Sequence, residues 1–319
     1  MIEPRQLYAD RRHRILHWPA PSGTTGQRLL VTFEHGRDGM RRFGPPTWPK
    51  LAGRHDLEVM AVQTARRDWY VSYRSGALAE ALSQLTEGYR DVVLSGFSMG
   101  AYAALLYSRA AHARRVLAVS PQYSIDPAVA PFDPMRHRKF RLIGRPMPLP
   151  QEMGDTQVTG LLIYDPTIAP DRQHAALIAA HFPRLSPCAL PYGGHPATGA
   201  LNDAGAVGTV TGMVIEAAID AGAVRALHRK LRSQSGRYRL RLTMAASTRH
   251  PARAAPALRQ IVEDPQAEAE QRLEAAIQMI DLQLPGAFDL LSQLLEDVPD
   301  PPQRWMGRIT RAIDRNGGF

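Results

Sequence analysis

The pentapeptide Gly96-Phe97-Ser98-Met99-Gly100 is the part of the sequence best suited to chemistry. It lies between "DVVLS", an apolar run that predicts a buried strand, and "AYAALLYSRA", an alanine-rich run that predicts a helix. Small residues two before and two after the serine let the backbone turn sharply, which exposes the serine side chain. A serine so placed can act as a nucleophile if a base, an acid and oxyanion donors surround it. The alternative, a turn serine with no chemical role, is disfavoured by the strand before it and the helix after it.

The longer segment "VVLSGFSMGAYAALLYS" resembles the nucleophile elbow of the α/β-hydrolase superfamily, in the Ser-Met-Gly form common among its esterase-like members. The resemblance covers roughly residues 29–221; it is strong at the elbow and weak elsewhere. It implies that Ser98 is the nucleophile and that the acid and then the histidine follow it in the chain.

Alternating strand and helix patterns predict an α/β fold with a mostly parallel, doubly wound sheet over residues 1–222. Strands are predicted at 28–34, 57–63, 91–95, from Arg114, from Val158 and at 185–192, and helices from Ser75, after Met99, over 171–181 and over 201–221. The proline-rich segment at about 123–156 has no clear periodicity, and a loop of this length in a compact domain predicts a cap or lid.

The catalytic base is predicted to be His195, which lies in "ALPYGGHPATGAL" after the last strand and before the last helix. The resemblance implies a histidine in this loop, and the two glycines before it would let the loop approach the serine closely. The other downstream histidines are less suitable. His112 follows the elbow helix at its far end, and His137 lies in the basic insertion. His174 and His181 belong to an amphipathic helix, where they are expected to be surface or packing residues.

Two aspartates in "LLIYDPTIAPDRQHA" are candidates for the acid. Asp165 ends a strand, on the edge of a parallel sheet where active sites form, and is the preferred candidate. Asp171 follows Pro170 and has an alternative role in the first turn of a helix. The resemblance implies an acid a few residues beyond the strand, between the two positions, so Asp171 remains open.

The oxyanion is expected to be stabilised by the Met99 N–H and by a second N–H from the loop "EHGRDG". His35-Gly36 in that loop resembles the superfamily's His-Gly, which points to Arg37 as the second donor. Trp69 and Tyr70, in the loop after residues 57–63, could line the substrate pocket or could equally be packing residues.

The lid segment carries five basic residues, among them Arg138, which is predicted to bind substrate. If the segment covers the site, it would favour an anionic acyl substrate, such as a phosphorylated, sulfated or CoA-linked one.

Residues 223–319 have helical patterns only. Pro251 and Pro285, like Pro265 and Pro299, are spaced as in a repeat of about 34 residues, which resembles tetratricopeptide repeats and suggests a protein partner. A plain helical tail is an equal alternative. The segment 221–262 has ten basic residues and no acidic one, whereas 263–300 is mostly acidic, so the two could be packed helices that neutralise each other. A basic surface for an anionic partner is the other interpretation, but no nucleic-acid recognition motif accompanies it, and binding of nucleic acid is not expected.

The remaining features narrow the class of protein. The sequence has no phosphate-binding glycine loop, no dinucleotide fingerprint and no zinc motif, so neither a cofactor nor a metal is expected. A single cysteine, Cys188, excludes an intramolecular disulfide. The N-terminal residues lack an apolar signal segment, and no apolar run is long enough to span a bilayer, so a cytoplasmic protein is expected.

Together these patterns predict a cofactor-independent serine hydrolase that cleaves a carboxylic ester or thioester through an acyl-enzyme on Ser98. An acyltransferase would use the same residues with a hydroxyl acceptor in place of water. A scaffold or binding protein on a hydrolase fold is the third hypothesis, and the presence of all three candidate residue types argues against it.

Overall fold

The computed structural model describes residues 3–37, 39–48, 50–298 and 300–316 of the chain. The chain divides into two compact units, Met1–His228 and Arg229–Phe319. The boundary predicted from the sequence, after residue 222, falls near the start of helix α9 (Ala221–Leu231), and the change of unit occurs within that helix.

One sheet organises the first unit, and within the described residues it has eight strands in the order β1-β2-β4-β3-β5-β6-β7-β8. The strands are β1 (Arg5–Ala9), β2 (His13–Trp18), β3 (Arg28–Phe33), β4 (Glu58–Thr64), β5 (Asp91–Phe97), β6 (Arg115–Val119), β7 (Thr159–Tyr164) and β8 (Leu185–Ala189). Strands β3 to β8 run parallel, and β2 pairs antiparallel with both β1 and β4. The predicted fold class, a mostly parallel sheet of the α/β-hydrolase type followed by a helical region, is confirmed.

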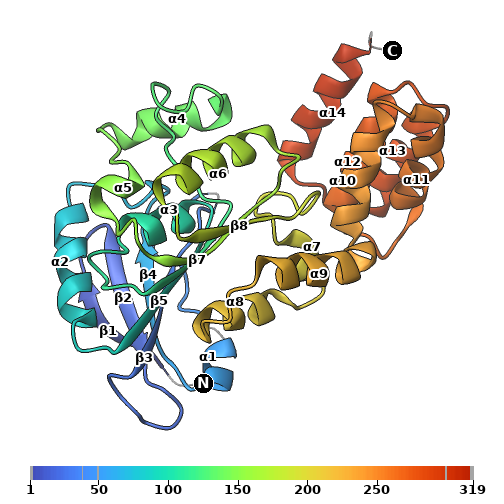
Figure 1. Ribbon diagram of the computed structural model, residues 1–319. Helices are drawn as coiled ribbons and strands as arrows, with labels where there is room; N and C mark the ends of the chain where they lie inside the picture. The colour runs from blue at the N-terminus through green and yellow to red at the C-terminus, as the bar shows by residue number, and fades with distance from the viewer. Residues whose placement is uncertain (1–2, 38, 49, 299, 317–319) are drawn as a thin grey trace. The chain divides into compact units, whose positions relative to one another are not determined.

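Helices cover both faces of this sheet (Figure 1). The helices of the first unit are α1 (Lys50–His55), α2 (Ser75–Thr86), α3 (Met99–Leu106), α4 (Pro134–Ile143), α5 (Pro150–Met153), α6 (Ala169–His181), α7 (Gly199–Asp203), α8 (Val207–Ile215) and most of α9. Helices α2, α3 and α6 pack on one face, where Leu78, Ala101 and Ile178 share a core with alternate residues of the central strands. Helix α8 contacts β5 and β6, on the side where Figure 1 also places α1.

The structure differs from the predicted elements at the N-terminal edge of the sheet and in the last predicted helix of the first unit, among other places. The two antiparallel strands at the N-terminal edge, β1 and β2, were not predicted. The single helix predicted over 201–221 is instead divided between α7, α8 and the start of α9, because Gly205 and Ala217 adopt positive φ angles of 66° and 55°. These left-handed conformations end a right-handed helix.

The carboxyl ends of the parallel strands form the edge that holds the candidate site. Ser98 directly follows β5, Asp165 directly follows β7, and the loop with His195 follows β8. The lid segment after β6 contains α4 and α5, so the stretch predicted as irregular is partly helical. In doubly wound sheets, ligands bind along this edge, which agrees with the placement expected for the nucleophile.

The second unit is helical in its described residues. Its elements are the end of α9, the short 3₁₀ helix η1 (Arg232–Gln234), α10 (Gly236–Ser247), α11 (Pro251–Glu263), α12 (Ala269–Asp281), α13 (Ala287–Asp297) and α14 (Gln303–Arg315). They enclose a separate apolar core that includes Leu273, Leu294 and Trp305.

Several ion pairs in this unit join α12 and α14. Glu270 pairs with Arg304 and Arg308, and Asp281 pairs with Arg315. Pairs between described residues also join the basic segment 221–262 to the acidic segment 263–300: Arg237 lies 3.8 Å from Glu268, and Arg259 lies 3.6 Å from Glu263. Helix α14 contributes further basic partners to the acidic segment.

Candidate active site

Ser98 sits in a strained turn between β5 and α3. Its φ and ψ are 51° and −119°, a backbone conformation that residues other than glycine rarely adopt. The flanking glycines are required by space: a Cβ at Gly96 would lie 2.2 Å from the carbonyl oxygen of Gly100, and a Cβ at Gly100 would lie 2.3 Å from that of Phe33. The Ser98 N–H donates to the Val119 carbonyl at 2.8 Å, which ties the turn to the neighbouring strand. The side chain is thereby held at the carboxyl edge of the sheet.

His195 lies between Ser98 and Asp171. Its Nε2 is 2.8 Å from Ser98 Oγ, and its Nδ1 is 2.9 Å and 3.1 Å from the two carboxylate oxygens of Asp171. An ionised carboxylate only accepts hydrogen bonds, so Nδ1 carries the proton and Nε2 accepts from the serine hydroxyl. Asp171 is 2 % exposed, whereas the His195 side chain is 24 % exposed. The arrangement thus places a serine hydroxyl, an imidazole and a buried carboxylate in one line of hydrogen bonds.

Asp165, the acid preferred from the sequence, does not contact the His195 ring. Its Oδ1 accepts from the N–H and hydroxyl of Thr167, at 2.9 Å and 2.6 Å, and from the Tyr192 N–H at 3.2 Å, while its Oδ2 accepts from the Gly194 N–H at 2.8 Å. The carboxylate is fully buried, and these donors occupy it. Asp165 thus holds the loop that carries His195.

Asp171 reaches the imidazole because α6 begins at Ala169, which places the carboxylate in the first helical turn. Asp171 can therefore lie in the first turn of the helix, as the sequence suggested, and contact His195 from the same position.

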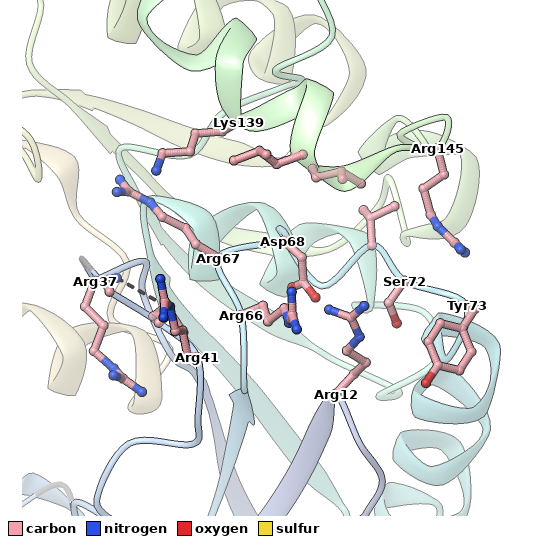
Figure 2. Close-up of a pocket in the computed structure, with 15 residues that line it drawn as sticks. Arg12, Arg37, Arg41, Arg66, Arg67, Asp68, Ser72, Tyr73, Lys139 and Arg145 are labelled. Atoms are coloured by element: carbon pink, nitrogen blue, oxygen red, sulfur yellow. Dashed lines mark hydrogen bonds between the residues drawn. The ribbon is translucent and has the colours of Figure 1, made fainter.

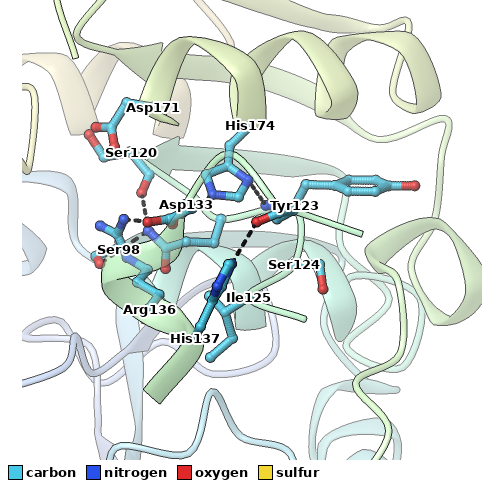
Figure 3. A network of polar contacts seen from close by, with 12 residues as sticks. Ser98, Ser120, Tyr123, Ser124, Ile125, Asp133, Arg136, His137, Asp171 and His174 are labelled. Atoms are coloured by element: carbon cyan, nitrogen blue, oxygen red, sulfur yellow. Dashed lines mark hydrogen bonds and ion pairs between the residues drawn. The ribbon is translucent and has the colours of Figure 1, made fainter. Parts of the chain in front are cut away.

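A residue of the segment predicted as a lid also contacts His195. Arg136, on α4, places one guanidinium nitrogen 3.2 Å from His195 Nε2 and another 2.8 Å from Asp133 Oδ2. The same carboxylate oxygen lies 3.0 Å from Nε2 of His174, whose Nδ1 accepts from the Tyr123 N–H at 3.2 Å (Figure 3). Sequence reasoning interpreted His174 as a surface or packing residue of a helix and gave Arg136 no particular partner.

Asp133 and His174 are both fully buried. Burial, the largest influence, lowers the pKa of His174 against the opposing hydrogen bond from Asp133, so this imidazole is neutral at pH 7. Burial would raise the pKa of Asp133, but hydrogen bonds and charges from His174 and Arg136 outweigh it and hold that pKa below its usual value. Asp133 is thus an ionised group that holds Arg136 beside His195.

Behind Ser98 lies Gln122, a residue that the sequence did not single out. Its side-chain nitrogen is 3.4 Å from Ser98 Oγ and 3.1 Å from the Ser120 carbonyl, and its oxygen accepts from Trp69 Nε1 at 2.8 Å. Trp69 and Tyr70 are 1 % and 0 % exposed. The predicted substrate-binding role of this aromatic pair is not what the geometry shows: Trp69 supports Gln122, and the Tyr70 hydroxyl bonds to backbone carbonyls.

The two predicted oxyanion donors differ in their surroundings. Met99 is the first residue of α3, and N–H groups at that position have no acceptor within the helix. The Arg37 N–H donates to Met40 Sδ at 3.4 Å, and the Arg37 guanidinium pairs with Glu34. The Arg37 N–H therefore already has an acceptor, although thioether sulfur is a weak one. Arg138, the predicted substrate contact on α4, is exposed to solvent.

Three further features of the described residues concern metal binding, the reactivity of the thiol and membrane insertion. No group of three or more His, Cys, Asp or Glu side chains in that part of the chain is arranged to hold a metal ion. Cys188 is buried, and burial raises the pKa of its thiol to about 11, which makes it a poor nucleophile at pH 7. None of the helices in the described segments is both long and apolar enough to cross a membrane.

No protein-family model matches the sequence, and no curated protein matches it closely. Solved structures with a similar arrangement include Est1E from Butyrivibrio proteoclasticus, at 9% identity and a TM-score of 0.45 over 68% of this chain and 100% of that chain. A hyperthermophilic esterase from the archaeon Pyrobaculum calidifontis is similar at 14% identity and a TM-score of 0.43, over 68% of this chain and 86% of the other. A capsule O-acetyltransferase of Neisseria meningitidis serogroup A is similar at 11% identity and a TM-score of 0.43, over 64% of this chain and 94% of the other. Such values carry no inference about the activity of this chain.

Proposed function

We propose that the protein is a serine hydrolase that cleaves a carboxylic ester or thioester through an acyl-enzyme on Ser98. The observation that carries the proposal is the 2.8 Å contact between His195 Nε2 and Ser98 Oγ, with Asp171 at 2.9 Å on the other side of the imidazole. Three residues from distant parts of the chain meet in the order and at the distances that acyl transfer to a serine requires.

In the first step, His195 Nε2 takes the proton of the Ser98 hydroxyl while Oγ forms a bond to the acyl carbon. The Asp171 carboxylate stabilises the imidazolium that results and keeps the ring oriented. The carbonyl oxygen becomes an oxyanion and accepts from the Met99 N–H. The Arg37 N–H is the second donor in this proposal, because exchanging a thioether for an oxyanion strengthens its hydrogen bond.

The tetrahedral intermediate collapses when the imidazolium returns its proton to the departing oxygen or sulfur, which leaves the acyl group on Ser98. Water then repeats the sequence with His195 as the base and releases the carboxylic acid. A substrate hydroxyl in place of water would give acyl transfer from the same acyl-enzyme, and only the products separate the two outcomes.

Labelling with an uncharged fluorophosphonate tests the proposal, because such probes react with a serine only when it is activated. The wild-type protein should be labelled on Ser98. Ser98→Ala should abolish labelling, and His195→Ala should slow it by several orders of magnitude. A wild-type protein that is not labelled would rule out the proposed enzyme and leave the scaffold hypothesis.

A further inference from the structure

A cavity with a volume of about 420 Å³ opens beside the candidate site, and basic side chains dominate its wall (Figure 2). They come from segments that the fold brings to the carboxyl edge of the sheet: the turn between β1 and β2, the loops after β3 and β4, and the lid. The basic lining residues are Arg12, Arg37, Arg41, Arg66, Arg67, Lys139 and Arg145. A volume of this size suits a small molecule or part of one.

Among the described residues that line the cavity, little negative charge compensates the basic side chains. Asp68 is the one acidic group among the described lining residues, and burial raises its pKa to about 6. Arg37 pairs with Glu34 outside the lining. Within the described part of the chain, Arg41, Arg66 and Arg145 form no ion pair with a carboxylate, and all three are exposed. Several cations held around one cavity repel one another, and a multiply charged anion relieves that repulsion.

The lid helix α4 connects this cavity to the base. Arg136 contacts His195, and Lys139, which lies three residues and about one helical turn further along, lines the cavity together with Ile143. Residues spaced by three and by seven lie on one face of a helix. The cavity therefore begins about one turn of α4 from the catalytic contact.

The loop after β3 makes a second connection. Arg37, the proposed oxyanion donor, lines the cavity, and a Cβ at the neighbouring Gly36 would lie 2.8 Å from Arg67 Nε. The residue proposed to hold the oxyanion therefore also borders the cavity.

The contact between Arg136 and His195 independently favours an anionic substrate. When Nε2 takes the serine proton, an imidazolium forms 3.2 Å from a guanidinium nitrogen, and two cations at that distance oppose each other. A negatively charged substrate group near Arg136 would offset the repulsion or draw the guanidinium away from the ring.

We infer that the cavity is a subsite for a phosphate-bearing part of the substrate, and that α4 couples this subsite to the base through Arg136. This inference rests on the proposed function of Ser98. Phosphate fits better than a single carboxylate, because the exposed arginines can each offer paired N–H donors and together carry more charge than one carboxylate can balance.

Calorimetric titration with inorganic pyrophosphate tests the subsite without any reaction. The double variant Arg66→Gln/Arg145→Gln removes two exposed charges from the wall. Arg90→Gln/Arg184→Gln is the matched control: both residues are exposed arginines directly before β5 and β8, at the opposite edge of the sheet. We expect saturable binding that weakens at least tenfold in the first variant and less than twofold in the control. No saturable binding to the wild-type protein, or equal loss in both variants, would overturn the inference.

The link to Ser98 is tested with two fluorophosphonates of equal length, one with an uncharged tail and one with a phosphate at the end of the tail. We expect the phosphate-bearing probe to label the wild-type protein at least tenfold faster, and this advantage to fall in Arg66→Gln/Arg145→Gln but not in the control. Equal labelling rates would refute the subsite and leave the serine hydrolase standing. If neither probe labels the protein, the proposed function fails, whatever the pyrophosphate titration shows.

Discussion

Replacing each of the two candidate aspartates by asparagine separates their roles. Asp171→Asn removes the negative charge 2.9 Å from His195 Nδ1. With an effective dielectric constant of about 20, a unit charge at that distance stabilises the imidazolium by about 5 to 6 kcal/mol. Each 1.36 kcal/mol corresponds to about a factor of ten in rate, so kcat should fall by about 10⁴-fold. A similar loss, about 10⁴-fold, follows the equivalent change in a serine protease.

Asp165→Asn should act on stability instead. The variant keeps one acceptor oxygen for Thr167 and Tyr192 but presents an amide N–H₂ to the Gly194 N–H, which loses its acceptor at 2.8 Å. A buried donor left without a partner costs about 1–3 kcal/mol. For a unit of this size, about 2–4 °C of Tm is lost per kcal/mol, so a decrease of about 2–12 °C is expected. Activity should fall modestly, as the loop before His195 loosens.

The assay measures two quantities on each variant: kcat for a 4-nitrophenyl ester, corrected for active sites by the burst of nitrophenol, and Tm by calorimetry. Asp171→Asn should lose kcat at an almost unchanged Tm, and Asp165→Asn should show the opposite pattern. If Asp165→Asn loses activity by orders of magnitude at an unchanged Tm while Asp171→Asn remains active, the proposed roles are reversed and the reasoning from the contacts is refuted.

Three further predictions concern stability. Gly100→Ala places a Cβ 2.3 Å from the Phe33 carbonyl oxygen, so the free energy of unfolding in urea should fall by about 3 kcal/mol; a loss below 1 kcal/mol would show that the turn can relax. His13 is buried, and burial lowers its pKa to about 4. The unfolded chain takes up a proton near pH 6.5 and the folded chain only near pH 4, so His13 should cost about 3 kcal/mol of stability as the pH falls through that window, and His13→Phe should lack this loss. Asp68 has the opposite sign: its raised pKa of about 6 makes the folded state lose about 3 kcal/mol as the pH rises from 4 to 6, so the stability of Asp68→Asn relative to wild type should rise across that range. The free energy of unfolding of each variant is compared with that of the wild type in urea titrations. A difference that does not change with pH, for His13→Phe or for Asp68→Asn, would contradict the burial argument.

Most of the secondary-structure elements and the sharp turn at Ser98 could be predicted because they depend on local patterns. The strand before Ser98, the helix after it and the Gly-Gly-His sequence before Pro196 all appear as consecutive residues. Where local signals conflicted, the prediction failed. Positive φ angles at Gly205 and Ala217 divide a helix that the composition favours, and nothing in the sequence specifies the angle at Ala217.

The preference for Asp165 over Asp171 shows a different limit. Both carboxylates lie near the carboxyl end of β7, six positions apart in the chain, and both are buried. Their difference arises from which donors the loop before His195 turns toward each one. The Tyr192 and Gly194 N–H groups face Asp165, and this arrangement depends on backbone angles at those residues that a sequence pattern does not reveal. Proximity to a strand end is thus insufficient evidence when two acids share it.

The lid network could not be found by pattern, because its contacts join residues far apart in the chain. Arg136 and His195 are separated by 59 positions, and His174 and Asp133 by 41. A basic lid predicts only that cations gather near the site, whereas the structure shows one of them fixed on the base by a buried carboxylate. This anchoring has a consequence for the reaction. Because Asp133 holds Arg136 beside His195, the imidazolium of the proposed reaction would form 3.2 Å from a guanidinium nitrogen, and a substrate anion that draws the guanidinium away would remove that repulsion. Selection for a charged substrate would then act on the chemical step as well as on binding.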